Sequence, residues 1–405
     1  MFLLGRMSRG FSSSSLLLLL GKHHYSSAWS SNYLFPRKIS PALFSSKPDN
    51  SAISDFLSTS ADITDVIRAE SIMEMKQVTE VVHGWPEPKR PILIETNDEF
   101  NSYVQNNSIE NFLFDCDGVL YRGTDAMPSA SRTIQQLINN GKKVFFVTNN
   151  AASTRMELKT KLEKVLNCSG VLKEEMMIGS AYVAGQYLKS CNLKAASGDK
   201  EARVHVIGTK GLCTELQSAG FDVSGGPDSD DIPSGMSRDE LASYPFPEGD
   251  IDALVIGLDN DFNYRKLCIA NVLLQRNPDA LLVATNLDAF DLVGFDARHL
   301  PGNGALVSAV EMASGRTAIN VGKPSQTLSK LIMEVYGLKA EETLMVGDRL
   351  DTDITFGNES GMKSALVLTG CTSASVLKEE ERNSKMIPSV ICPHVGFMSD
   401  TATIN

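Results

Sequence analysis

The chain has 405 residues, which is enough for two or three domains, and the composition of an ordinary globular protein. Its formal net charge of −11 argues against a nucleic-acid-binding surface, so no nucleic-acid partner is expected. The seven cysteines form no CxxC pair or Cys/His cluster, which argues against a disulfide framework and a zinc site.

The first fifty residues differ from the rest of the chain. They contain no acidic residue before Asp49 and are basic and rich in serine, which is typical of an organellar targeting presequence over residues 1–50. A plastid or mitochondrial location is therefore expected, and a disordered tail is the alternative. The apolar run at 16–20 is too short to span a bilayer, but it could be the core of a secretory signal ahead of a transit peptide. No later stretch predicts a stable membrane span.

Residues 51–95 are interpreted as a linker with a modest helix. From residue 96 onward, strand and helix patterns alternate, which predicts an α/β fold with a parallel sheet and right-handed crossovers. Ser153 is the expected start of the helix that contains Glu157, and residues 225–248 are expected to form an extended loop. Buried strands are predicted at 112–114, 143–147, 176–178, 204–207, 253–258, 281–284, 319–321, 343–346 and 365–368. Helices are predicted at 129–140, 211–219, 264–275, 304–314 and 325–336.

Four groups of polar side chains directly follow predicted strands. Open α/β sheets bind ligands at the carboxyl ends of their strands, so these groups are expected to meet. Each group alone has an ordinary explanation as a turn, a helix cap or a solvated charge. Their coincidence after four buried strands favours a site. The groups are Asp115 with Asp117; Thr148, Asn149 and Asn150; Lys323; and Asp348 with Asp351 and Asp353.

The carboxylates of these groups match the requirements of phosphoryl transfer. Asp115 can act as the nucleophile and form an aspartyl-phosphate. Asp117 can protonate the leaving oxygen and then activate water. Asp115 and Asp348 can bind Mg²⁺, a hard cation that prefers oxygen ligands, and Asp353 is expected to support these ligands.

The remaining groups are suited to bind the phosphate of a substrate. Lys323 supplies a compact positive charge. Thr148 and the neighbouring Asn149 and Asn150 can donate hydrogen bonds to phosphate oxygens without adding negative charge. The expected partner is therefore a small-molecule phosphate ester.

The four motifs resemble those of the haloacid dehalogenase (HAD) superfamily of aspartate-nucleophile phosphatases. The residues in these motifs are most similar to those of the branch that contains eukaryotic phosphoglycolate phosphatases, pyridoxal phosphate phosphatases and 4-nitrophenyl phosphatases. Flanking matches at 262–264 and 284–288 support this branch. The motifs lie at 115–120 (DCDGVL), 147–150 (VTNN), 321–325 (VGKPS) and 346–354 (VGDRLDTDI).

The resemblance implies a Rossmann-like core with a parallel sheet, formed by residues 96–193 and 304–405. It also implies a large α/β cap, inserted at 194–303, that selects the leaving group. Asp117 is expected to bind Mg²⁺ through its backbone carbonyl, which leaves its side chain for proton transfer. Some relatives dimerise through their caps, so a homodimer is an expectation for this chain.

The sequence thus predicts a Mg²⁺-dependent phosphomonoester hydrolase, with 2-phosphoglycolate as the preferred substrate. Import into an organelle fits this substrate, because 2-phosphoglycolate arises in plastids during photorespiration. The alternatives are a pyridoxal 5′-phosphate phosphatase, a broad 4-nitrophenyl phosphatase and, in a different class, a non-catalytic scaffold of the same fold. The intact Asp115, Asp117, Lys323 and Asp348 argue against the scaffold.

Overall fold

The structure is a computed structural model that describes residues 63–86, 90–193, 201–227, 235–245, 249–293, 298–380 and 383–399. The predicted presequence at 1–50 lies outside this range. Among the described helices, none combines the length and the apolar character needed to cross a membrane.

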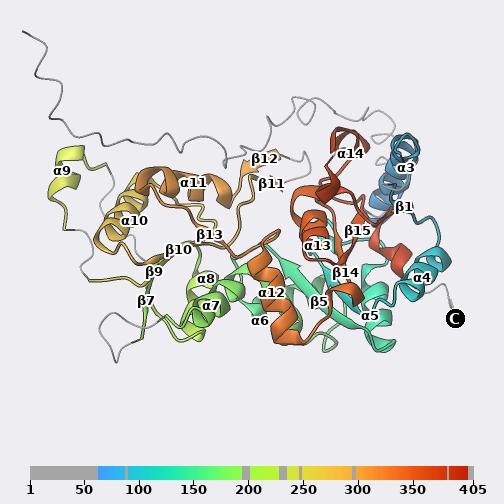
Figure 1. The fold of residues 1–405 in the computed structure, drawn as a ribbon, viewed down its shortest axis with the longest axis horizontal. Helices are drawn as coiled ribbons and strands as arrows, with labels where there is room; N and C mark the ends of the chain where they lie inside the picture. Colours follow the sequence, from blue (N-terminus) through green and yellow to red (C-terminus); the bar gives the residue numbers. More distant parts are fainter. Residues whose placement is uncertain are drawn as a thin grey trace, which may run out of the picture. The chain divides into compact units, whose positions relative to one another are not determined.

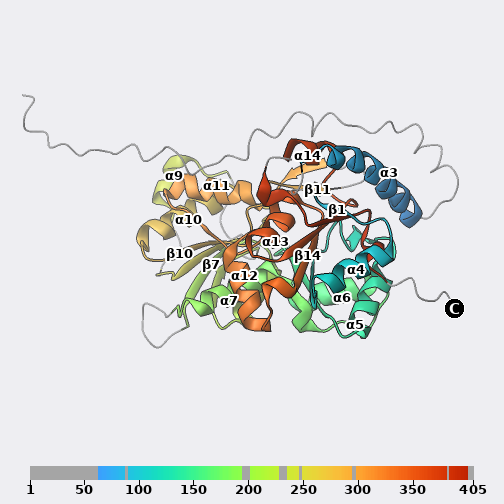
Figure 2. The ribbon, with the colours of Figure 1, turned by 45° about the vertical axis from the view of Figure 1, so that its right-hand side comes forward.

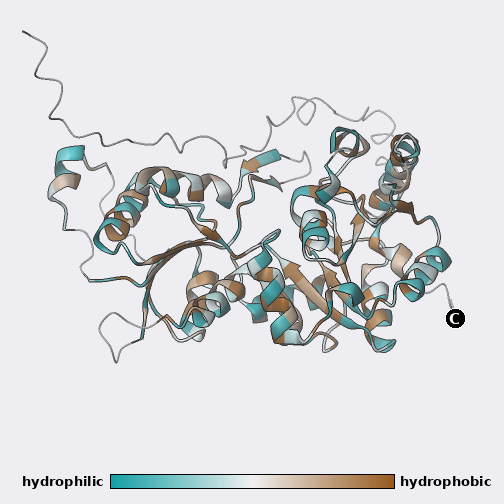
Figure 3. Ribbon diagram, viewed as in Figure 1, coloured by the Kyte–Doolittle hydropathy of each residue, from teal (hydrophilic) through white to brown (hydrophobic). Residues whose placement is uncertain are grey.

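The main sheet has seven strands, and every neighbouring pair in it is parallel. This parallel pairing confirms the expected α/β core. Figure 3 shows that the strands of the sheet are largely apolar. In spatial order the strands are β1 (Ile92–Leu93), β16 (Val390–Cys392), β15 (Lys363–Val367), β14 (Thr343–Gly347), β2 (Asn111–Phe114), β5 (Lys143–Thr148) and β6 (Met177–Gly179).

Helices cover both faces of this sheet. Phe112 and Phe114 of β2 pack into one apolar cluster, whereas Leu113 between them packs into another, as the alternation of side chains along a strand requires. This two-sided burial explains why β2 is apolar at consecutive positions. The first cluster includes side chains of α4 (Asn97–Asn106), α5 (Ala130–Asn139) and α6 (Arg155–Val165), and the second those of α7 (Ser180–Ser190), α12 (Gln326–Tyr336) and α13 (Thr355–Glu359).

A second, five-stranded sheet is built mainly from the segment between the second and third motifs. Its pairs are also parallel, and Figure 1 shows α10 and α11 beside its strands. The sheet consists of β13 (Ile319–Asn320), β10 (Leu281–Ala284), β9 (Ala253–Ile256), β7 (Arg203–Ile207) and β8 (Asp222–Gly225). Its helices are α8 (Lys210–Ser218), α9 (Arg238–Ser243), α10 (Tyr264–Arg276) and α11 (Asn303–Ser314).

Two antiparallel hairpins and five short helical turns complete the described fold. The hairpins are β3 (Tyr121–Arg122) with β4 (Asp125–Ala126), and β11 (Phe290–Val293) with β12 (Arg298–Pro301). The turns are η1 (Glu174–Met176), η2 (Ala340–Glu342), η3 (Leu350–Ile354), η4 (Ser384–Met386) and η5 (Val395–Met398).

Two local predictions are wrong, one strand was not predicted, and we revise the proposed boundary of the cap. The second sheet extends past residue 303, the predicted end of the cap, because β13 pairs with β10; we therefore propose that the cap reaches about residue 320. The segment 225–248, expected to be a loop, contains α9, which begins with a capping box between Ser237 and Glu240. Residues 222–225, where no strand was predicted, form β8. The helix α6 begins after Thr154 rather than Ser153, because Thr154 has the three-residue spacing to Glu157 that a capping box requires.

The segment 51–95, interpreted as a linker with a modest helix, contains a 21-residue helix, α3 (Ile63–His83), and the edge strand β1, which was not predicted. One face of α3 buries Met75, Val78 and Val82 in a cluster with Leu366 and Leu377. The Glu74 carboxylate accepts a hydrogen bond from the backbone N–H of Ala374 at the start of α14 (Ala374–Glu380), 2.6 Å away. Figures 1 and 2 both show α3 beside α14. The helix is therefore part of the core.

Removal of α3 is expected to destabilise the protein. We expect a chain that begins at Arg90 to lose about 3–5 kcal/mol in free energy of unfolding relative to one that begins at Ile63. A fully buried aliphatic side chain contributes about 1.5–3 kcal/mol, and the entropy cost of ordering the helix offsets part of the sum. Urea denaturation of the two chains measures the difference. Equal midpoints would show that α3 is dispensable.

Candidate active site

The backbone of β2 places Asp115 at the edge of the main sheet. The backbone N–H of Asp115 donates to the carbonyl of Val346 in the neighbouring strand β14, over 2.8 Å. β14 ends at Gly347, directly before Asp348, so the pairing of the two strands brings these carboxylates together.

Three of the four predicted groups meet in one cluster. Asp115, Asp348 and Asp353 each offer a carboxylate oxygen within 4.8 Å of the others. The ammonium of Lys323 lies 2.5 Å from Oδ1 of Asp115 and 2.7 Å from Oδ1 of Asp353. It also donates to the carbonyl of Val147, over 2.8 Å, which fixes it to the end of β5.

The cluster carries more negative than positive charge. Three carboxylates face one ammonium, which leaves a formal excess of two negative charges in a buried place. Desolvation raises the pKa of Asp115 well above its usual value, with contributions from Asp353 and Asp348, although Lys323 opposes the shift. Desolvation and Asp353 likewise raise the pKa of Asp348 to about 6. Burial alone would lower the pKa of Lys323, but Asp115 and Asp353 outweigh it and raise the pKa.

This excess charge and the donor set suit a divalent cation. Carboxylate oxygens are the ligands that hard cations such as Mg²⁺ prefer, and a charge of +2 would balance the cluster. Asp353 uses Oδ2 to accept the backbone N–H groups of Asp348 and Arg349, at 3.2 and 3.1 Å. Its bonds therefore orient the loop that carries Asp348. Asp348 itself uses Oδ2 for the N–H of Cys371, at 2.7 Å, which leaves Oδ1 for a cation.

Two glycines lie so close to the Asp348 carboxylate that a side chain at either position would clash with it. Gly118 has a φ of +80°, and a Cβ there would lie 2.7 Å from Oδ2 of Asp348. A Cβ on Gly370 would overlap the same oxygen. The close approach of these two loops therefore depends on the absence of side chains.

We expect Gly370→Ala to weaken cation binding about 10–100-fold, because it displaces a carboxylate whose orientation the surrounding loop sets. The concentration of Mg²⁺ that gives half-maximal activity measures this effect. Gly84→Ala is the matched control, since the nearest atom to its Cβ, the carbonyl oxygen of Val81, would lie 3.3 Å away. Equal Mg²⁺ dependence in the two variants would contradict the assignment.

The side chain of Asp117 lies outside the three-carboxylate cluster; it is partly exposed to solvent and partly packed beside Tyr121. Desolvation raises its pKa, as does the charge of Asp291, while Lys161 and Arg122 lower it. A raised pKa favours the protonated form that a proton donor needs. The predicted contact between its backbone carbonyl and a metal stays a prediction.

The second motif spans the end of β5, and its side chains make different contacts. The Oγ1 of Thr148 accepts the N–H of Asn150, at 3.2 Å, and keeps its own proton for a ligand. The amide of Asn149 is used within the protein: Oδ1 accepts the N–H of Lys323, at 2.8 Å, and Nδ2 donates to Asp288, at 2.9 Å. This leaves only the backbone N–H of Asn149 for the predicted phosphate contact. The exposed Asn150 accepts the N–H of Ala152.

Several residues of the site had no predicted role. Asp288 binds Asn149, and Arg349 forms a bidentate pair with Asp351, at 3.0 and 3.2 Å. Arg349 also donates to the carbonyl of Phe290, at 3.2 Å, and its guanidinium lies 5.1 Å from the centre of the Phe290 ring. These contacts tie the loop of Asp348 to the hairpin β11–β12. Asp288 lies in the segment 284–288, whose sequence resembles the family branch named above. Its role depends on its contact with Asn149, which lies 139 positions earlier in the chain.

Comparisons with known proteins agree with this geometry. Residues 112–222 match a family model described as haloacid dehalogenase-like hydrolase, and 320–392 match a related HAD hydrolase model. Phosphoglycolate phosphatase 1A, chloroplastic, of Arabidopsis thaliana is 38% identical over 278 residues, which cover 68% of this chain and 73% of the relative. Glycerol-3-phosphate phosphatase of Rattus norvegicus is 37% identical over 289 residues, which cover 70% and 87%.

A solved structure shows the same fold. The glycerol phosphate phosphatase Rv1692 from Mycobacterium tuberculosis, in complex with magnesium, matches with a TM-score of 0.56 and 27% identity. The match covers 72% of this chain and 77% of that one. The site geometry, the family models and these relatives agree: the chain belongs to the haloacid dehalogenase-like hydrolase family.

Proposed function

We propose that this protein is a Mg²⁺-dependent phosphomonoester hydrolase that acts through an aspartyl-phosphate on Asp115. The observation that carries the proposal is the cluster of Asp115, Asp348 and Asp353 around Lys323, with two excess negative charges. A generic protein core does not bury such an excess without a cation to balance it. The named relatives are phosphatases of small phosphate esters, which supports the same reaction class.

Each reaction step can be assigned to a residue. A carboxylate oxygen of Asp115 attacks phosphorus, the bond to the leaving oxygen breaks, and Asp117 gives its proton to that oxygen. Asp117 then takes a proton from water, which attacks phosphorus and releases phosphate and free Asp115. Lys323 holds Asp115 in position, and Thr148 donates to a phosphate oxygen.

Asp115 and Asp348 would hold the Mg²⁺, with Asp353 as their support and the backbone carbonyl of Asp117 as a further ligand. When bound, the cation offsets the repulsion between the attacking carboxylate and the phosphate dianion. Lys323 alone cannot do this, because Asp115 and Asp353 already share its charge.

We propose 2-phosphoglycolate as the preferred substrate. The chloroplastic phosphoglycolate phosphatase relative supports it, as does the basic, serine-rich segment 1–50, which we propose directs import into a plastid. The glycerol-3-phosphate phosphatase relative supports glycerol 3-phosphate as the second candidate. Residues 1–62 fused to a fluorescent protein would test import; cytosolic fluorescence would contradict it.

The substrate is tested by kcat/KM with 2-phosphoglycolate, glycerol 3-phosphate, pyridoxal 5′-phosphate and 4-nitrophenyl phosphate. We expect 2-phosphoglycolate to exceed each of the others by at least about tenfold, a difference of about 1.4 kcal/mol in transition-state binding. Activity on all four should vanish in EDTA and return with Mg²⁺. A tenfold preference for glycerol 3-phosphate would overturn the substrate but not the reaction class. No hydrolysis of any ester would favour the scaffold alternative.

A further inference from the structure

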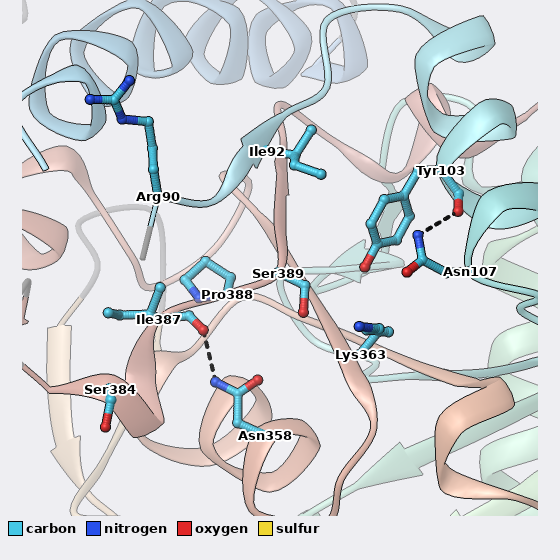
Figure 4. A pocket seen from close by; sticks show the side chains of 10 residues that line it. All are labelled: Arg90, Ile92, Tyr103, Asn107, Asn358, Lys363, Ser384, Ile387, Pro388 and Ser389. Atoms are coloured by element: carbon cyan, nitrogen blue, oxygen red, sulfur yellow. Dashed lines mark hydrogen bonds between the residues drawn. The ribbon is translucent and has the colours of Figure 1, made fainter. Parts of the chain in front are cut away.

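A cavity of about 470 Å³ lies in the main sheet domain, and no step of the proposed reaction uses it. Figure 4 shows its walls, which come from the start of the main sheet strands, from α4, from α13 and from the segment around η4. Its volume falls in the range of small-molecule sites. The lining residues are Arg90, Ile92, Tyr103, Asn107, Asn358, Lys363, Ser384, Ile387, Pro388 and Ser389.

The cavity opens at the edge of the sheet opposite the carboxylate cluster. Ile92 and Lys363 are the first residues of β1 and β15, and Ser389 directly precedes β16. Asp115 and Asp348 instead follow the last residues of β2 and β14. Because all these strands are parallel, the cavity and the catalytic cluster lie at opposite ends of the strands. A ligand in the cavity would therefore be a second molecule and not the substrate.

The charges around the cavity favour an anion. Its lining contains two bases and no acid, although the whole chain has a net charge of −11. Lys363 has no carboxylate within ion-pairing distance in the part of the chain that the structure describes. The guanidinium of Arg90 donates to the carbonyls of His83 and Trp85, both at 2.9 Å, at the end of α3. Arg90 is therefore held at the end of α3, and Figure 4 shows its guanidinium directed away from Lys363 and Tyr103, so Lys363 is the base that faces the ligand.

The hydrogen-bonding groups point to the same ligand. The hydroxyl of Tyr103 is buried beside Ser389, its one polar neighbour among the described residues that interacts with it, but the two groups lack good hydrogen-bond geometry. In Figure 4 its ring extends from α4 towards Ser389 and Lys363. The hydroxyl oxygen of Ser389 accepts the N–H of Ser364, at 3.2 Å, so its proton can turn towards Tyr103 or a ligand. Leaving a buried hydroxyl without a partner costs about 1–3 kcal/mol, so a bound acceptor would stabilise this site.

We propose that this cavity binds a small oxyanion, a phosphate or carboxylate group, through Lys363 and Tyr103. Lys363 supplies the charge, and the hydroxyls of Tyr103 and Ser389 donate to the anionic oxygens. The apolar side chains of Ile92 and Ile387 pack against the organic part of the ligand. Charge-assisted bonds of this kind are about twice as strong as neutral ones.

The test measures the melting temperature of the full chain against the concentration of inorganic phosphate, with succinate as the carboxylate probe. EDTA is present throughout, because without a cation the three carboxylates of the catalytic cluster repel a phosphate dianion. A ligand that binds only the folded state raises the melting temperature with its concentration. Stabilisation by phosphate but not by succinate identifies a phosphate site. Stabilisation by succinate but not by phosphate identifies a carboxylate site.

Three variants decide whether the stabilisation arises in the cavity. We expect Lys363→Met to weaken the apparent affinity at least tenfold, Tyr103→Phe to weaken it several-fold, and Lys363→Arg to retain it. Lys330→Met is the matched control, since Lys330 is an exposed lysine of α12 outside the cavity. Stabilisation by neither probe, or equal stabilisation of wild type and Lys363→Met, would overturn the proposal. These outcomes do not depend on catalysis, so they are separate from the test of the proposed function.

Discussion

Asp115→Asn should lower kcat by at least about 10⁴-fold while the fold remains intact, because the amide cannot form an acyl-phosphate. The variant should not melt at a lower temperature than wild type in EDTA. Desolvation raises the pKa of Asp115, as do the like charges of Asp353 and Asp348, so a neutral group of the same shape removes both the cost of burying the charge and the repulsion. Turnover of a generic aryl phosphate and thermal unfolding measure the two effects.

Asp351→Asn is the matched control for this variant. Asp351 belongs to the fourth motif, but its side chain is 54% exposed and its carboxylate forms an ion pair with Arg349 at the surface. We expect its kcat to stay within about tenfold of wild type, since surface ion pairs contribute about 0–1 kcal/mol. Residual turnover of Asp115→Asn at a similar level would contradict the assignment of the nucleophile.

Lys323→Met should lose both stability and activity. Its ammonium is 2% exposed and bridges Asp115 and Asp353, so its removal leaves two buried carboxylates without their cation. Breaking a buried pair in this way costs about 3–5 kcal/mol. Because the pKa of Lys323 is raised, its contribution is fully present below the ordinary lysine pKa of about 10.4. Urea unfolding at pH 7 in EDTA, with kcat in Mg²⁺, measures both losses.

Lys266→Met distinguishes a loss of stability from a loss of catalysis. Lys266 forms a comparable buried ion pair with Asp259, at 2.8 Å, in the proposed cap. This variant should also lose stability, but its kcat should stay near wild type under conditions where it is folded. If Lys323→Met and Lys266→Met lost the same amount of activity, the proposed role of Lys323 in holding Asp115 would be wrong.

The sequence predicts the main sheet well, because its strands are buried on both faces and therefore read as unbroken apolar runs. Short elements carry no such signal: β1 and β16, with two and three residues, were not predicted. The sequence predicts a modest helix within a linker here but not the burial of α3, because charged and polar residues separate the apolar side chains of the single face that meets α14. The burial of this face depends on a partner about 300 positions away.

The sequence was sufficient to predict those site residues whose chemistry and position after a strand define their role. Asp115, Asp348, Asp353 and Lys323 meet as expected, because parallel strands bring their carboxyl ends to one edge. The use of the Asn149 amide was not predictable, because an asparagine can serve a ligand or the protein equally well. Its partners, Asp288 and the backbone of Lys323, become visible only in the folded chain.

A covalent phosphate at Asp115 is the most direct consequence of the proposed mechanism. Acid quenching during turnover with Mg²⁺, followed by reduction with borohydride, converts an acyl-phosphate to an alcohol, so an aspartyl-phosphate becomes homoserine. Mass spectrometry of the peptide with residues 112–122 should show homoserine at Asp115 with substrate, and not without substrate or in Asp115→Asn. Rapid turnover with no modification at Asp115, or with modification at another carboxylate, would contradict the proposed mechanism.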